Sequence, residues 1–459
     1  MYDVIIIGAG LSGISAGVRL SHYGRKVRIL EKQRYPGGMN GYYERAGRTI
    51  DVGLHALTNF APEGIRGAPL NKLLRQMRLR RHELDLCPQT FSEIVFPQCS
   101  LRLNNDFAAF AAQVDKLFPT EADGFHRLCE RIRQTDALSP TAPELSARAI
   151  LNDYLSSSLL QDMLLCPVML YGNPQADDMD FNQFCIIFQS VILEGFGRPR
   201  HGMKPFLECL LKRYADQGGE LSLGVGVTAL NVRDGRITAV VTDQGEELHA
   251  DAVLSCAGVL ETARLCSTPP PELAAFPAGA IGFCETIFEL DCRPRALGLD
   301  ACVIFRNCPE RFRFSTPAGS VDLSSQIICM PGNYQQCDDI ADANTVRVSV
   351  LASPAWWLDL SPDAYGKAKK NVADAQIALL EAWKPGFAGA VAGWDMFTPK
   401  TIRRFTGHVN GVIYGSPRKL RQGASADLSN LFICGADQGF LGIVGALMSG
   451  AAIANRHLL

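Results

Sequence analysis

Three glycines and one acidic residue near the start of the chain have the types and spacing of a dinucleotide-binding site. Gly8, Gly10 and Gly13 directly follow the apolar residues 4–7, and Glu31 ends a second apolar run 23 residues after Gly8. In such a site the first glycine permits a tight turn, the second lets the backbone approach a pyrophosphate, and the third lets a helix pack close to a sheet. An acid at this distance accepts hydrogen bonds from ribose hydroxyls.

These residues need a strand, a turn, a helix and a second strand to position them. Residues 2–32 supply an apolar run, a glycine turn, a small-residue helical pattern and another apolar run, in that order. This order predicts a βαβ unit whose helix presents its free N–H groups and positive end to a diphosphate. Glycines also mark ordinary turns, so the prediction depends on the strands, the helix and the acid occurring together.

The composition is that of a globular protein without a strong charge bias. Of the 459 residues, 47% are hydrophobic and 20% are charged, and the formal net charge is -2. The length predicts more than one domain, and the near-neutral charge gives no reason to expect a nucleic-acid partner. The fifteen cysteines form no C-x-x-C pair, so we expect neither a metal centre nor a thioredoxin-like redox centre.

Two features bear on where the protein acts. Tyr2 already belongs to the first predicted strand, so we expect no signal peptide and a cytoplasmic location. Basic residues are interspersed with leucines over residues 72–81, namely Lys72, Arg75, Arg78, Arg80 and Arg81. Such a helix could associate peripherally with an anionic membrane at its cytoplasmic face. The alternative is a solvated face of an ordinary domain helix, and the sequence leaves the oligomeric state open.

A second glycine-rich segment makes the pattern specific to one group of proteins. Pro36-Gly37-Gly38-Met39 follows Glu31 closely, and an Asp51-x-Gly53-x-His55 element comes next. Together with the first motif, these elements resemble the FAD-binding half of the phytoene desaturase-like flavoproteins, a group within the amine oxidase-like superfamily.

This resemblance implies a glutathione reductase-type Rossmann domain that binds FAD. Gly37, Gly38 and Met39 would pass near the ribose and diphosphate, beside Glu31 and the adjacent Lys32, and Asp51 and Gly53 would lie close to the flavin. His55 would be the titratable side chain nearest the flavin. It would act there either as an acid–base group or through a structural hydrogen bond.

Motifs farther along the chain extend the resemblance. Val227 would contact the adenine through its backbone, and Ala257 lies in a small-residue turn that follows a strand. A T-P-x-T, T-G, G-x-x-Y-G series over residues 398–415 resembles a segment of carotenoid desaturases, carotenoid isomerases and retinol saturases. The last segment implies flavin contacts from Gly435, Asp437, Gly442, Ile443 and Val444. The positive end of the helix that begins near Gly442 would stabilise negative charge on the reduced flavin.

The motifs alternate with unrelated segments, which predicts two interleaved domains in an α/β protein. Residues 1–60, 196–270 and 410–459 would form the discontinuous FAD-binding domain. Residues 61–195 and 271–409 would form an α+β substrate-binding domain. Within it, we expect residues 61–195 to be mostly helical and residues 283–351 to supply an antiparallel sheet as one wall of the substrate cavity.

The resemblance implies an FAD-dependent oxidoreductase that acts on C–C or C=C bonds of a long hydrophobic substrate, such as a polyisoprenoid, carotenoid or retinoid. Hydride transfer at the flavin N5 would carry the reaction, and desaturation, saturation and isomerisation all stay open. The sequence has no second G-x-G-x-x-G followed by an acid, so electrons would leave through oxygen, a quinone, a diffusible partner or the substrate. Two alternatives remain: an amine oxidase or protoporphyrinogen oxidase-like flavoenzyme, and a flavin-containing lipid or carotenoid carrier.

Overall fold

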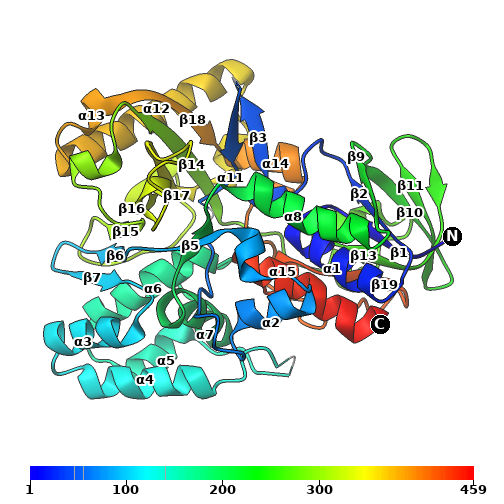
Figure 1. Ribbon diagram of the computed structural model, residues 1–459, viewed down its shortest axis with the longest axis horizontal. Helices are drawn as coiled ribbons and strands as arrows, with labels where there is room; N and C mark the ends of the chain where they lie inside the picture. Colours follow the sequence, from blue (N-terminus) through cyan, green and yellow to red (C-terminus); the bar gives the residue numbers. More distant parts are fainter. Residues whose placement is uncertain (46, 55, 140) are drawn as a thin grey trace.

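The computed structural model describes residues 1–45, 47–54, 56–139 and 141–459. A five-stranded parallel sheet with the order β19-β13-β1-β2-β9 lies at one end of the molecule, together with both chain termini (Figure 1). Its strands are β1 (Tyr2–Ile7), β2 (Val27–Glu31), β9 (Glu220–Leu223), β13 (Ala250–Ser255) and β19 (Leu431–Ile433). This arrangement confirms the predicted Rossmann-type α/β fold, because β1, the glycine turn, α1 (Leu11–His22) and β2 form the expected βαβ unit.

Two helices pack directly on α1. The C-terminal helix α15 (Gly442–Ile453) approaches so closely that a Cβ added to Gly450 would lie 1.9 Å from the carbonyl oxygen of Ser12. The Ser15 hydroxyl also donates to the carbonyl oxygen of Leu447 at 2.6 Å. On its other side, α1 contacts α8 (Met203–Asp216) (Figure 1). Chain segments more than 400 residues apart are thereby joined beside the parallel sheet.

A small antiparallel sheet flanks the parallel one, and two short strand pairs stand apart. The small sheet contains β10 (Val227–Arg233), β11 (Arg236–Thr242) and β12 (Glu247–Leu248). In the two separate pairs, β3 (Tyr42–Arg45) pairs with β4 (Arg48–Asp51), and β5 (Leu86–Pro88) pairs with β8 (Gly197–Pro199). Asp234 and Gly235 turn between β10 and β11 with φ of 49° and 70°. Positive φ at both positions suits a tight two-residue hairpin, which is why Asp-Gly favours it.

The second large sheet has seven strands in the order β18-β14-β17-β16-β15-β6-β7. They are β6 (Ser92–Val95), β7 (Ser100–Leu103), β14 (Gly282–Leu290), β15 (Val303–Asn307), β16 (Val321–Cys329), β17 (Thr345–Ala352) and β18 (Val391–Phe397). All neighbours pair antiparallel except β15 and β6, which pair parallel. The expected antiparallel sheet is therefore present, but it also takes two strands from a region that the sequence predicts as mostly helical.

Most of the remaining helices gather beside this second sheet (Figure 1). They are α3 (Phe107–Leu117), α4 (Ala122–Gln134), α5 (Ala147–Tyr154), α6 (Ser158–Gly172), α7 (Phe181–Phe188), α11 (Pro354–Leu358), α12 (Pro362–Trp383), α13 (Phe387–Ala390) and α14 (Pro399–Thr406). Two short helices, α9 (Val259–Leu265) and α10 (Pro271–Ala274), follow β13. The division into two domains at the predicted residues stays a prediction.

The basic segment near residue 72 forms α2 (Pro69–Gln76) and the turn after it. Its leucines, Leu70, Leu73 and Leu74, are buried in the same core as α15 and α1. The exposed side chains Lys72, Arg75, Arg78 and Arg80 form what we call the basic stripe. No helix among the described residues is long and apolar enough to cross a membrane. Because the leucines pack inward, any membrane contact of this helix would have to use its charges.

Candidate functional site

The glycine turn after β1 has the shape that a diphosphate requires. Gly8 adopts a φ of 97°, and a Cβ added to Gly13 would lie 2.2 Å from the carbonyl oxygen of Gly8, so the turn and helix pack as predicted. Gly10, in contrast, has no described atom within 4 Å of the position of an added Cβ. The backbone is thus exposed to open space at the start of α1, where free N–H groups and the helix dipole favour an anion.

Glu31 and the glycine doublet close around this turn. The Glu31 carboxylate accepts hydrogen bonds from the backbone N–H groups of Ala9 and Gln33, both at 2.8 Å. Gly37 donates to the carbonyl oxygen of Ala9 at 2.7 Å, and an added Cβ on Gly38 would lie 3.5 Å from the Cα of Gly10. Met39 lies in the 3-10 turn Gly38–Asn40 that follows. We call this assembly of residues 8–13, Glu31 and residues 37–39 the glycine cradle.

The segment that precedes β10 lies beside the end of β2. Val225 donates its N–H to the carbonyl oxygen of Glu31 at 2.9 Å, and Val227 begins β10 two residues later. A Cβ on Gly226 would lie 3.3 Å from the Cβ of Lys32. Burial lowers the pKa of the Lys32 ammonium, although the carboxylates of Glu31 and Glu261 oppose this shift. Val227 and Lys32 therefore lie on the side of the cradle that contains Glu31, as an adenosine contact would require.

The C-terminal motif reaches the cradle from the opposite side. A Cβ added to Gly435 would lie 3.3 Å from the Ser12 hydroxyl oxygen at the start of α1. The Asp437 carboxylate accepts from the N–H of Val259, just after the turn that contains Ala257, and from the N–H of Ser416, both at 2.7 Å. Asp437 thus ties together three segments that border the cradle.

The start of α15 faces the second half of the molecule. A Cβ on Gly442 would lie 3.5 Å from the ring of Tyr171 and 3.8 Å from the hydroxyl oxygen of Thr58. Ile443 and Val444 are buried in the core that contains α1. The N-terminus of α15 therefore points toward the place where the second half of the molecule meets the cradle. No described side chain caps this helix.

The D-x-G turn is held by contacts from both halves of the molecule. Asp51 accepts on its carboxylate from the N–H of Met203 at 2.9 Å, at the start of α8. Arg347, on β17, donates to the carbonyl oxygens of Asp51 at 2.9 Å and Gly53 at 2.6 Å. Its guanidinium also forms an ion pair with Glu285 on β14 at 2.7 Å. His55 lies outside the described residues, so its predicted role is not addressed by the structure.

Sequence reasoning missed Arg347 and Glu285, although both stand out as charged residues in otherwise apolar strands. Both are buried, with exposed fractions of 2% and 7%. Burial by itself would lower the pKa of Arg347, but the carboxylates of Glu285 and Asp51 outweigh it and raise that pKa. The Arg347 guanidinium therefore stays charged, and its contacts connect the D-x-G turn to the second sheet.

A second unpredicted pair borders the cradle. Glu261, on α9, lies 3.5 Å from Nδ1 of His408 and accepts from the N–H of Val409 at 2.6 Å. Burial opposes the charge on both groups, yet their mutual attraction raises the pKa of His408 and lowers that of Glu261. His408 directly follows the Thr406-Gly407 motif, and a Cβ on Gly407 would lie 2.7 Å from the Lys32 ammonium nitrogen. That motif thus marks a contact with Lys32, which follows Glu31 of the cradle.

Aromatic rings form an apolar wall near the start of α15. Tyr171 lies 6.0 Å from Phe196, and Phe283 lies 5.6 Å from Tyr414, measured between ring centroids. The Tyr171 hydroxyl donates to the carbonyl oxygen of Ala56, and the Tyr414 hydroxyl donates to that of Leu170 at 2.7 Å. Burial raises the pKa of both phenols. These tyrosines therefore present rings rather than proton donors.

The residues brought together fit FAD in shape and chemistry. A diphosphate matches the open space at Gly10 and the uncapped start of α1. A flavin edge matches the uncapped start of α15, and a ribose matches the acid at the end of β2. Among the described residues, no group of three or more His, Cys, Asp or Glu side chains could hold a metal ion. Which of these residues touch the cofactor stays a prediction.

Comparison with known proteins agrees with this geometry. The sequence model of the family described as "Flavin containing amine oxidoreductase" matches residues 11–458. The chain is similar to a chloroplastic prolycopene isomerase from Daucus carota, with 25% identity over 92% of this chain and 73% of that protein. It is also similar to a phytoene dehydrogenase from Streptomyces griseus, with 28% identity over 58% of this chain and 56% of that one.

Solved structures share the fold. An oxidoreductase from Methanosarcina mazei aligns with a TM-score of 0.69 and 16% identity, over 99% of this chain and 100% of the other. Putrescine oxidase bound to putrescine aligns with a TM-score of 0.61 and 14% identity, over 99% of this chain and 98% of the other. The chain belongs to the flavin-containing amine oxidoreductase family, as an FAD-dependent oxidoreductase related to carotenoid desaturases and isomerases.

Proposed function

We propose that the chain acts on C–C or C=C bonds of a long hydrophobic substrate, a polyisoprenoid of carotenoid or retinoid type. The observation that carries this proposal is the aromatic wall beside the start of α15. Its two tyrosine hydroxyls are engaged by backbone carbonyls, so these tyrosines offer a substrate their rings and no free hydroxyl. Rings of this kind stack against a polyene and exclude water.

The roles of the chain's own residues follow from this placement. FAD, when bound, supplies the site at N5 that takes up or returns a hydride. The cradle would hold its diphosphate and ribose, the Arg347–Glu285 pair would fix the D-x-G turn, and the start of α15 would stabilise negative charge at the flavin edge. In a desaturation the substrate would lose a hydride and a proton. In an isomerisation it would lose and regain both, with no net change in oxidation state.

The experiment is a reaction of the purified holoprotein with a poly-cis carotenoid in detergent micelles under anaerobic conditions. Chromatography separates isomers, desaturated products and saturated products, with the FAD used either oxidised or previously reduced by dithionite. We expect turnover to at least one of these products. Holoprotein that carries FAD and converts neither this polyene nor a retinoid in either redox state would contradict the proposal.

Amine oxidation is the second candidate, because the ring of Tyr171 lies close to the start of α15 and Tyr414 carries a second phenol ring in the same core. Paired rings of this kind can also enclose an amine next to a flavin. Release of hydrogen peroxide with a panel of primary amines and polyamines would favour this candidate. A carrier that keeps FAD for structure alone would show no flavin reduction with any C–H donor.

A further inference from the structure

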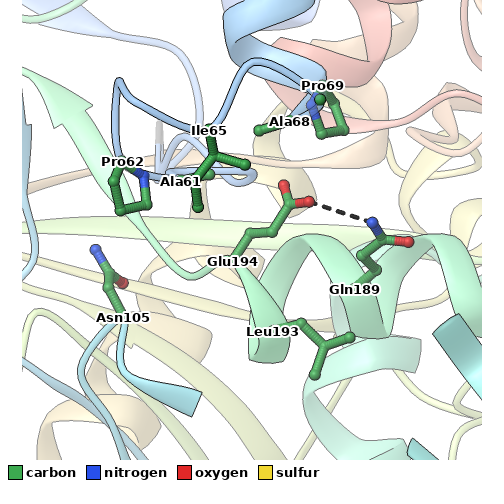
Figure 2. Close-up of a pocket in the computed structure, with 10 residues that line it drawn as sticks. Ala61, Pro62, Ile65, Ala68, Pro69, Asn105, Gln189, Leu193 and Glu194 are labelled. Carbon is green, nitrogen blue, oxygen red and sulfur yellow. Dashed lines mark hydrogen bonds between the residues drawn. The ribbon is translucent and has the colours of Figure 1, made fainter. Parts of the chain in front are cut away.

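A hollow beside the predicted flavin region opens between the loop before α2 and the end of the π-helix Gln189–Leu193, which continues α7. Its volume is about 300 Å³, and its lining includes Ala61, Pro62, Ile65, Asn105, Leu193 and Glu194 (Figure 2). We call it the mouth pocket. This volume is at the lower end of the range for small-molecule sites and suits one end of a larger molecule or a short chain of about ten carbons.

The pocket is divided into an apolar side and a polar side. Ala61, Pro62 and Ile65 come from the loop, and Leu193 adds an alkyl group from across the pocket. On the polar side, the Glu194 carboxylate points toward Gln189 and accepts from its amide at 3.2 Å (Figure 2). Asn59 donates to the other Glu194 oxygen at 2.9 Å. A carboxylate offers about four lone pairs, so two acceptor sites remain for a ligand.

Packing and hydrogen bonds around the next two residues hold Glu194 in place. Gly195, at φ of 82°, leaves room for the Asn105 side chain, since an added Cβ would lie 1.9 Å from its amide oxygen. Asn105 in turn pairs with the backbone N–H and carbonyl of Phe196, both at 2.8 Å. The backbone that follows Glu194 is therefore fixed. Burial raises the pKa of Glu194, while Asn59 and Gln189 work against that rise.

A hydrogen-bonded path links this carboxylate to the predicted flavin region. Asn59 donates to Glu194, and its own amide oxygen accepts from the Thr58 hydroxyl at 3.4 Å. Thr58 is the residue that faces Gly442 at the start of α15. A molecule seated in the mouth pocket would therefore have its polar end three side chains away from the helix start that is aimed at the flavin.

The surrounding charge selects among possible ligands. Arg81 donates to the carbonyl oxygen of Ala61 at 2.6 Å, and Arg75 donates to that of Arg66 at 2.7 Å, so guanidinium groups border the loop that forms the pocket. The Glu194 carboxylate would repel an anionic ligand, whereas a neutral hydroxyl can donate to it. The side-chain partners of Glu194 are the neutral amides of Asn59 and Gln189.

We propose that the mouth pocket binds the hydroxyl end of an isoprenoid alcohol, with the Glu194 carboxylate as the acceptor of its O–H. This inference rests on the proposed function, because it makes the mouth pocket the entry for that same hydrophobic substrate. It narrows the substrate class to polyisoprenoids that carry a terminal hydroxyl group.

The test compares geraniol with geranyl methyl ether, which has the same chain but no O–H. Isothermal titration of each into the FAD-loaded protein should show geraniol binding about tenfold more tightly, because a hydrogen bond to a charged acceptor is lost with the ether. In Glu194→Gln the ratio should fall to about threefold or less. Glu63→Gln, on the same loop but outside the pocket lining, is the matched control and should keep the wild-type ratio.

Leu193→Trp locates the binding site, because the larger ring would fill the pocket and weaken the binding of both probes. Equal affinities in the wild type, an unchanged ratio in Glu194→Gln, or unchanged affinities in Leu193→Trp would each overturn the proposal. If Glu194→Gln fails to fold, the wild type and Leu193→Trp still decide. The FAD content and polyene turnover of the same samples report on the proposed function separately, so each can fail without the other.

Discussion

Replacing Arg347 with methionine should destabilise the protein and weaken its hold on FAD. The guanidinium makes three buried contacts, to the carboxylate of Glu285 and to the carbonyl oxygens of Asp51 and Gly53. Methionine fills similar space but leaves Glu285 as an uncompensated buried charge. Breaking a buried ion pair in this way costs about 3–5 kcal/mol of the free energy of unfolding.

A double variant separates the charge from the carbonyl contacts. Arg347→Met with Glu285→Met removes the stranded charge, and replacing both partners of a buried pair by apolar residues is often close to neutral. The two backbone carbonyls would still lack their donor, so we expect a remaining deficit of about 2 kcal/mol. The double variant should therefore be more stable than Arg347→Met and less stable than the wild type.

The assay is urea unfolding followed by circular dichroism, with FAD content measured on the same samples. Arg48→Met is the matched control, because Arg48 on β4 pairs at 2.7 Å with Glu289 on β14 and both side chains are exposed. Such an exposed pair contributes about 1 kcal/mol or less. If Arg347→Met unfolds within about 1 kcal/mol of the wild type and keeps its FAD, the reasoning about the D-x-G turn is wrong.

Three further predictions follow from the site. Gly10→Val should lose FAD yet keep the apoprotein's unfolding midpoint, because its side chain would enter open space, whereas Gly13→Val should lower that midpoint itself; equal losses in both variants would argue against the cradle. The His408–Glu261 pair should stabilise the fold most between pH of about 4.5 and 6.5: the raised pKa of His408 gives stability that is lost as pH rises through it, and the lowered pKa of Glu261 gives stability that is lost as pH falls through it. The stability difference between wild type and His408→Gln should therefore shrink above pH 6.5, as measured by urea unfolding across pH, and a flat difference would contradict the pairing. Replacing the basic stripe by glutamine should abolish co-sedimentation with anionic vesicles at low salt, because only its charges are exposed, and retention of binding would place the contact elsewhere.

The glycine cradle could be predicted from the sequence because its geometry is local. Gly8 and Gly13 act within one turn, and their requirement for glycine follows from positive φ and from close helix packing. The hairpin at Asp234-Gly235 and the helix over residues 362–383 could be read for the same reason. Sequence patterns can predict elements whose conformation depends on residues that are close together in the chain.

The ion pair at the D-x-G turn could not be predicted, because it depends on strand register. Glu285 lies opposite Ser349 and Ile287 opposite Arg347, so the pair meets diagonally across two strands about 60 residues apart. The strands β6 and β7 were missed because each has only four residues and gains its place by pairing with β15 and with each other. The orientation of α2 likewise depends on a distant part of the chain, because its leucines pack against α15.

The most direct test of FAD binding by the glycine cradle is a visible absorption spectrum of the purified protein, followed by release and mass spectrometry of the bound cofactor. We expect a flavin band and about one FAD per chain, since one cradle is formed by β1, α1 and β2. Colourless protein that also fails to take up added FAD would contradict the central claim that this cradle binds the flavin cofactor.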